Sequence, residues 1–223
     1  MAPPTDTADT LLHELRDEVR QHYPSGRVII GVDGVDGAGK TRFAEALARV
    51  FAEDGSAVFT ASIDDFHRPR AERYARGRDS PQGFYLDSYD DGAFRRLLIE
   101  PFRSRSGPFR TAAFDLDRDE PVTAEAQDAP ADAVLIVDGI FLHRPELRGI
   151  WNWSLWLHVP ASLAAARLAE RDGADPDPEA ESNARYRGGQ ALYAREADPR
   201  TAASAIVDNS FPDAPVRIFG DFC

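Results

Sequence analysis

One stretch constrains the fold of this chain more than any other. Gly34-Val35-Asp36-Gly37-Ala38-Gly39-Lys40-Thr41 matches the phosphate-binding loop pattern G-x-x-x-x-G-K-[ST] at every fixed position. An apolar, β-branched run at 27–32 precedes the loop, as expected for a buried parallel strand. Apolar residues follow it at helical spacing. Because strand, loop and helix are in register, we favour a working phosphate site over a chance glycine-rich turn.

The chemistry of this motif explains its residue types. Glycines let successive amide N–H groups turn toward an anion, and the following helix adds the positive end of its dipole. Lys40, the only lysine in the chain, supplies a compact charge for the β- and γ-phosphates, and the Thr41 hydroxyl is a natural Mg²⁺ ligand. We therefore expect ATP and Mg²⁺ as cofactors, with the nucleotide held by Gly34, Asp36, Gly37, Ala38, Gly39, Lys40 and Thr41.

Strand-like and helix-like segments alternate along the rest of the chain. Further strands are predicted at 57–63, 133–137, 153–159 and 203–207, and helices at 7–23, 90–102, 160–171 and 185–196. This alternation predicts an α/β fold with a doubly wound parallel sheet flanked by helices. We expect one domain over 1–223, with an N-terminal helix (1–26) on the core, an irregular insertion at 71–89, a small hairpin (111–115 and 120–123) and a flexible lid at 172–184.

The amino-acid composition restricts the classes of partner that this chain can bind. The formal net charge of −12 argues against a broad nucleic-acid surface, so a polyanionic ligand needs a few focused groups. No apolar run reaches the roughly 18 residues of a membrane span, and the N-terminus lacks a signal-peptide pattern. The single cysteine, Cys223, excludes an intrachain disulfide. We expect a cytoplasmic protein without membrane or nucleic-acid partners; the sequence leaves a homo-oligomer open.

Acidic residues follow three predicted strands. In parallel sheets ligands lie beyond the carboxyl ends of the strands, where Asp36, Asp64/Asp65 and Asp138 are expected. Asp138 follows four apolar residues, which is the form of a Walker B site for Mg²⁺; its alternative is an ordinary strand-end carboxylate. Asp64 or Asp65 could take the proton of an acceptor hydroxyl, or Asp64 could cap the next turn.

Two arginines precede the predicted lid. Arg167 and Arg171 are four residues apart, so they share a helix face. There they could neutralise charge on a transferring phosphoryl group. A solvated arginine pair is an equal alternative.

Three segments together resemble a known family. GVDGAGKT, IDDFHRPR and VLIVDGIF are similar to the uridine kinase-like group, within the uridine kinase/phosphoribulokinase/pantothenate kinase family of P-loop kinases. The resemblance spans roughly 28–209. It implies that Asp64 is the base, that Asp138 and Thr41 hold the metal, and that the lid arginines are Arg167 and Arg171. It also implies a set of acceptor-binding residues: Asp64, Phe66, His67, Asp87, Tyr89 and Phe114.

The departures from that family concern the acceptor. Uridine-specific members carry a Tyr and then a His on the hairpin, where this chain has Phe114 and Asp119. We therefore expect a kinase of a small polar acceptor, a nucleoside such as uridine or cytidine in the first place. The alternatives are a kinase of a sugar, a vitamin precursor or a nucleoside monophosphate, and a nucleotide-binding regulatory module without an acceptor.

Overall fold

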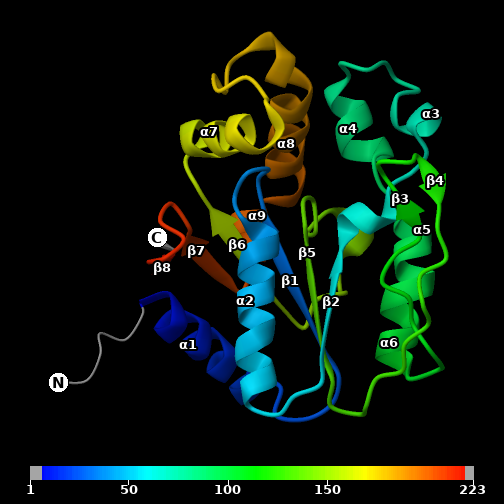
Figure 1. Cartoon of the computed structure of the whole chain (residues 1–223), viewed down its shortest axis with the longest axis vertical. Coiled ribbons are helices and arrows are strands. Elements are labelled where there is room, and N and C mark those ends of the chain that lie inside the picture. Colours follow the sequence, from blue (N-terminus) through cyan, green and yellow to red (C-terminus); the bar gives the residue numbers. More distant parts are fainter. Residues whose placement is uncertain (1–6, 219–223) are drawn as a thin grey trace.

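The computed structural model describes residues 7–218 and shows a parallel sheet with helices on both faces (Figure 1). The sheet order is β2-β5-β1-β6-β7-β8. Five strands are parallel: β1 (Val28–Gly34), β2 (Val58–Ser62), β5 (Val134–Gly139), β6 (Trp153–His158) and β7 (Ala205–Asp208). A short antiparallel strand that the sequence did not predict, β8 (Val216–Ile218), closes one edge. The predicted fold class is confirmed.

The two central strands explain why the sheet is strongly specified. Every residue of β1 and of β5 is buried, because helices cover both faces of a parallel sheet. The register pairs Asp33 with Gly139, and Ser62 with Asp138. The carboxyl ends of β1, β2 and β5 therefore lie side by side, and the loops that follow them meet at one edge.

One face of the sheet is covered by α1 (Thr7–His22) and α2 (Lys40–Glu53). Leu15 of α1 and Leu47 of α2 are fully buried in the core on this side. α1 and α2 therefore share one core on this face of the sheet. Residues 1–6 of the predicted N-terminal segment, and Cys223, lie outside the described residues.

The opposite face carries α4 (Pro81–Asp87), α8 (Ala184–Ala197) and a long helical run (Figure 1). The predicted helix at 90–102 is observed as α5 (Asp91–Phe94), a π-helical turn (Arg95–Ile99) and α6 (Glu100–Ser104). Pro101 has no N–H to donate to the Leu97 carbonyl, which accepts the Arg110 N–H instead, at 2.8 Å. The proline therefore explains this departure from a regular α-helix.

Shorter elements complete the acceptor side. The hairpin β3 (Phe114–Asp115) and β4 (Glu120–Pro121) has only two residues a strand, since Pro121 cannot donate to a ladder. The insertion at 71–89 is more helical than predicted. The other elements are η1 (Ile63–Phe66), α3 (Arg70–Arg73), η3 (Pro145–Leu147), α7 (Ala161–Asp172), η4 (Glu181–Asn183) and α9 (Pro199–Ala202). Within residues 7–218, none of the helices combines the length and apolar character needed to cross a bilayer.

Candidate active site

The phosphate-loop residues connect β1 to α2. Gly37 has φ of +75°, and a Cβ there would come within 2.5 Å of the Ala164 carbonyl oxygen on α7. The loop therefore needs glycine for both its backbone conformation and its contact with α7. Lys40 Nζ donates to the Val35 carbonyl at 2.9 Å, so its charge lies against the loop.

Thr41 and Asp138 meet at the first turn of α2. The Thr41 hydroxyl donates to Asp138 Oδ2 at 2.8 Å. Burial raises the pKa of Asp138 to about 6, assisted by Asp64 and Asp65 and opposed by Thr41 and Lys40. A hydroxyl and a carboxylate at a phosphate loop fit Mg²⁺, which usually takes one or two protein oxygens and completes its shell with phosphates and water.

Asp64 borders a cavity of about 490 Å³. Asp36, Tyr89 and Arg171 line the same cavity. The Tyr89 hydroxyl donates to Asp64 Oδ1 at 2.8 Å, which leaves the other carboxylate oxygen available to an acceptor. Asp64 does not cap the turn: the Ser62 hydroxyl does so, accepting the Asp64 N–H at 3.2 Å.

Asp65 differs from its neighbour. Its carbonyl accepts the Ala113 N–H at 2.9 Å, and it is absent from the lining of the Asp64 cavity. Burial raises the pKa of Asp65, with the Asp64 charge adding to the effect. Of the two carboxylates, the geometry favours Asp64 as the group that meets an acceptor.

Asp36 lies within the loop and against α8. Gln190 Nε2 donates to Asp36 Oδ2 at 3.1 Å. Burial raises the pKa of Asp36, and the Lys40 charge opposes that rise. Asp36 is thus a second carboxylate in the cavity, placed between the loop and α8.

The structure separates the two arginines before the lid segment. Arg171 lines the Asp64 cavity and pairs with Asp172 at 2.6 Å. Arg167 instead donates to the Gly37 carbonyl at 3.3 Å and the Asn209 carbonyl at 2.9 Å. It borders another cavity, of about 570 Å³, beside Gly39. Arg167 therefore hydrogen-bonds to the backbone of the phosphate loop, whereas Arg171 is the arginine that shares a cavity with Asp64.

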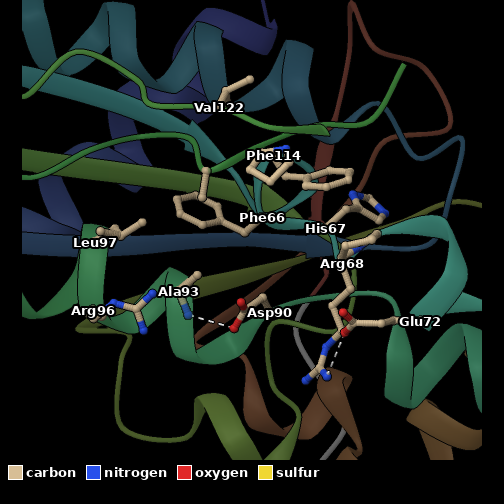
Figure 2. Close-up of a pocket in the computed structure, with 13 residues that line it drawn as sticks. Phe66, His67, Arg68, Glu72, Asp90, Ala93, Arg96, Leu97, Phe114 and Val122 are labelled. Carbon is tan, nitrogen blue, oxygen red and sulfur yellow. Dashed lines mark hydrogen bonds and ion pairs between the residues drawn. The ribbon is translucent and has the colours of Figure 1, made fainter. Parts of the chain in front are cut away.

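A smaller cavity of about 360 Å³ lies under the hairpin (Figure 2). Phe66, His67 and Phe114 line it, with Arg96 and Leu97 on the helical run. Phe66 is fully buried and packs edge-on against Phe94, so it is also a core residue.

His67 borders both cavities. Its Nδ1 lies 2.7 Å from the Asp64 carbonyl oxygen, and its ring is 4.5 Å from the Tyr89 ring. Burial lowers the pKa of His67, against the opposing pull of Asp64, so the neutral ring is favoured. His67 thus joins the two cavities.

Two acidic residues of the acceptor side have other partners. Asp87 pairs with Arg76 at 2.8 Å and lines neither the Asp64 cavity nor the hairpin cavity, so the structure does not bring it to Asp64. Asp119 accepts the Arg70 N–H at 2.8 Å and pairs with Arg73 at 3.0 Å. Asp119 therefore ties the hairpin to α3.

Sequence reasoning missed the contribution of α8. Tyr186 and Gln190 line the Asp64 cavity, and Tyr193 is buried behind the loop. Their i, i+4, i+7 spacing, which puts them on one helix face, was visible in the sequence. Nothing local indicated that this face meets the phosphate loop, some 150 residues earlier.

Known proteins resemble this chain in sequence and in fold. No family model matches the chain. A curated protein named uridine kinase, from Leuconostoc citreum (strain KM20), is 30% identical over 154 residues, covering 65% of this chain and 68% of that protein.

Two solved structures share the fold. One, from Bacillus stearothermophilus, is provisionally described as a uridine kinase; it has a TM-score of 0.66, 22% identity, and coverage of 86% of this chain and 98% of that one. The other, from Silicibacter sp. TM1040, is provisionally described as a fructose transport system kinase, with a TM-score of 0.66, 25% identity, and coverage of 87% and 95%. Together with the curated relative, these likenesses show that the chain is an enzyme and belongs to the uridine kinase-like family of P-loop kinases.

Proposed function

We propose that this kinase transfers the γ-phosphate of ATP to a hydroxyl of a small polar acceptor, a nucleoside in the first place. One observation carries the proposal: Asp64 opens into a cavity that also contains Asp36 of the phosphate loop. An acceptor hydroxyl at Asp64 would lie beside the nucleotide's terminal phosphate.

Phosphate binding, metal binding and proton transfer are carried out by different residues around the loop. Lys40 and the loop amides hold the phosphates, and Thr41 and Asp138 provide oxygen ligands for Mg²⁺. When bound, Mg²⁺ neutralises charge on the phosphates. Asp64, oriented by the Tyr89 hydroxyl, accepts the proton of the attacking hydroxyl. Arg171 adds positive charge from the lid side of the cavity.

The acceptor's identity is the finer part of the proposal. A relative named uridine kinase supports a nucleoside. Phe114 in the hairpin cavity can cover the face of a base, but a phenyl ring offers no hydrogen bond to its edge. Asp119 does not line the hairpin cavity, and its Oδ1 accepts from the Arg70 N–H and from Arg73, so it does not stand in for the base-reading histidine.

A sugar is the second candidate. The Silicibacter neighbour, described provisionally as a fructose transport system kinase, supports it, and so does the missing base-reading histidine. A sugar would need only the Asp64 cavity, whereas a nucleoside would also occupy the hairpin cavity. The sizes of the two cavities permit either.

Acceptor-stimulated ADP release tests the proposal. The purified protein is incubated with Mg·ATP and, in turn, uridine, cytidine, a purine nucleoside, a pentose, fructose and pantothenate. We expect at least one hydroxyl compound to accelerate ADP release, and the Asp64→Asn variant to lose that acceleration. If no compound raises the rate above basal hydrolysis, or if Asp64→Asn responds like the wild type, the proposed function is wrong.

The same panel yields a specificity prediction. Strong discrimination comes from buried polar groups that the wrong ligand leaves unpaired, and the hairpin offers none for a base edge. We expect either broad nucleoside acceptance or a preferred acceptor other than uridine, judged by kcat/KM. A uridine preference above about 10⁴ over all other compounds, the range that polar readout can give, would contradict this interpretation of the pocket.

A further inference from the structure

A buried carboxylate lies directly before the phosphate loop and outside the proposed chemistry. Asp33 is the penultimate residue of β1 and is fully buried. Its Oδ1 accepts the N–H of Gly34, the first residue of the loop, at 2.8 Å. Its Oδ2 accepts from His143 Nδ1 at 2.7 Å and from the Tyr193 hydroxyl. A buried charge is tolerated only when donors surround it in this way.

His143 extends the network to the next strand. Its Nε2 lies 2.9 Å from the Ser154 hydroxyl on β6, and its backbone N–H donates to Tyr193 Oη at 2.9 Å. With the ring proton on Nδ1, the Ser154 hydroxyl can donate to Nε2, and each polar atom then has a partner. Ser154 is thus at the far end of a chain whose other end is the loop.

The other donor on Oδ2, the Tyr193 hydroxyl, comes from α8. Tyr193 lies one turn after Gln190, which donates to Asp36 in the middle of the loop, at 3.1 Å. α8 therefore contacts the loop region at two points, Asp33 and Asp36. Tyr193 is buried among Phe141, Tyr85 and Trp156, with ring centroids 5.1 to 6.4 Å away, so its hydroxyl is held in place.

We propose that Tyr193 is a positioning residue for the phosphate loop. By completing the donor set of Asp33, its hydroxyl fixes the carboxylate that holds the Gly34 amide, and so keeps the loop in its anion-binding shape before nucleotide arrives. Without the hydroxyl, Oδ2 loses a donor in a dry site and the carboxylate reorients or admits water. Part of the binding free energy of the nucleotide is then used to reorder the loop. The inference rests on the proposed binding of Mg·ATP at this loop.

The experiment compares the nucleotide affinity of three hydroxyl-deletion variants. Tyr193→Phe keeps the ring and removes only the donor to Asp33. Ser154→Ala removes a hydroxyl from the far end of the same network and leaves all three donors of Asp33 in place. Tyr23→Phe removes a phenol that bonds the Asn152 carbonyl, away from the loop. Calorimetric titration with Mg·ADP gives Kd, and thermal unfolding gives Tm for each variant.

We expect Tyr193→Phe to raise the Kd for Mg·ADP at least fivefold at a temperature where it is fully folded. Ser154→Ala and Tyr23→Phe should stay within twofold of wild type, even where their Tm values fall. A purely structural role would lower the Tm of Tyr193→Phe and leave its Kd unchanged, and that result overturns the inference. An equal loss of affinity in Ser154→Ala overturns it too. If the wild type itself binds no Mg·ADP, the proposed function fails and this inference fails with it.

Discussion

Lys40 is the only lysine in the chain, and its Nζ donates to the Val35 carbonyl of the phosphate loop. Replacing it with alanine should leave the fold intact, because it fills no core position. Loss of a preorganised charge on the phosphates should cost about 3 kcal/mol in the transition state. We expect Lys40→Ala to slow phosphoryl transfer by about 10²-fold while circular dichroism and Tm stay near wild type. The control is Arg195→Ala, which removes an exposed charge on α8; near-normal turnover of folded Lys40→Ala would contradict the assignment.

Asp64 and Asp65 form a natural matched pair. Both follow β2, but only Asp64 lines the cavity and accepts from Tyr89. Asp64→Asn should keep nucleotide affinity and lose about 10²–10⁴-fold in acceptor-dependent kcat, since an amide cannot take the proton. Asp65→Asn should lose less than tenfold. Steady-state kinetics with titrated ADP binding checks both; an exchange of the two phenotypes would mean that Asp65 is the base.

Among the helices and strands, the sequence predicted those whose formation depends on a local pattern of apolar residues. β1 and β5 are continuous apolar runs because both faces of each are buried, so their position was readable. β8 was missed because it is a three-residue edge strand without such a run. The π-helical turn at 95–99 depends on Pro101 and on a long-range hydrogen bond from Arg110 to Leu97. The hydrophobic periodicity of the sequence does not indicate this hydrogen bond.

The candidate site also contains residues that the sequence predicted and residues that it did not. The phosphate loop, Thr41 and Asp138 were predictable because each belongs to a known sequence pattern, and the geometry brings Thr41 and Asp138 together. Asp87 was expected among the acceptor-binding residues, but it ends α4 and pairs with Arg76 instead, which the sequence spacing alone does not reveal. The role of α8 depends on how a late helix packs across the sheet.

The hairpin gives a prediction at the element scale. Asp119 has φ of +56° and anchors the hairpin to Arg70 and Arg73 of α3. Asp119→Asn keeps a residue that tolerates the left-handed region but removes the charge. We expect the KM of the acceptor to rise several-fold, because Phe114 lies on this hairpin, while the KM of ATP stays within twofold. Arg118→Gln, at an exposed neighbouring position, is the control. A rise in the KM of ATP with no change in the KM of the acceptor would show that the hairpin does not take part in acceptor binding.

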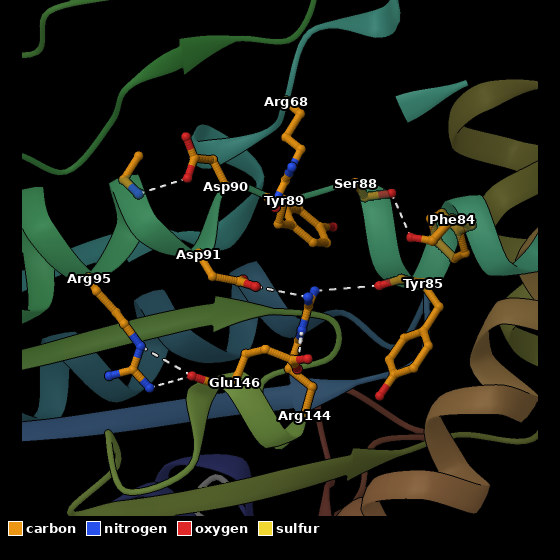
Figure 3. Close-up of polar contacts among 11 residues, drawn as sticks. Arg68, Phe84, Tyr85, Ser88, Tyr89, Asp90, Asp91, Arg95, Arg144 and Glu146 are labelled. Carbon is orange, nitrogen blue, oxygen red and sulfur yellow. Dashed lines mark hydrogen bonds and ion pairs between the residues drawn. The ribbon is translucent and has the colours of Figure 1, made fainter. Parts of the chain in front are cut away.

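The whole molecule depends on how the acceptor-side helices attach to the sheet. Arg144 follows β5 and is buried, and Figure 3 shows its guanidinium between three partners. It donates to Asp91 at the start of α5 at 2.8 Å, to Glu146 at 3.1 Å and to the Tyr85 carbonyl of α4 at 3.4 Å. Burial raises the pKa of Asp91 despite the opposing pull of Arg144, so desolvation is the larger effect at this carboxylate. Arg144 thus joins α4 and α5 to the sheet through one buried charge.

Removing that charge should be costly, because it leaves the partly buried Asp91 carboxylate unpaired. Breaking a buried pair from one side typically costs about 3–5 kcal/mol, whereas replacing both partners with apolar groups is often near neutral. We expect Arg144→Met to lower the free energy of unfolding in urea by about 3 kcal/mol, and Arg144→Met/Asp91→Leu to recover a large part of that loss. Glu146→Gln, which changes a half-exposed partner, should cost under about 1 kcal/mol. A double variant no more stable than Arg144→Met would mean that the arginine stabilises the molecule through its packing on Tyr85, and not through its pairing with Asp91.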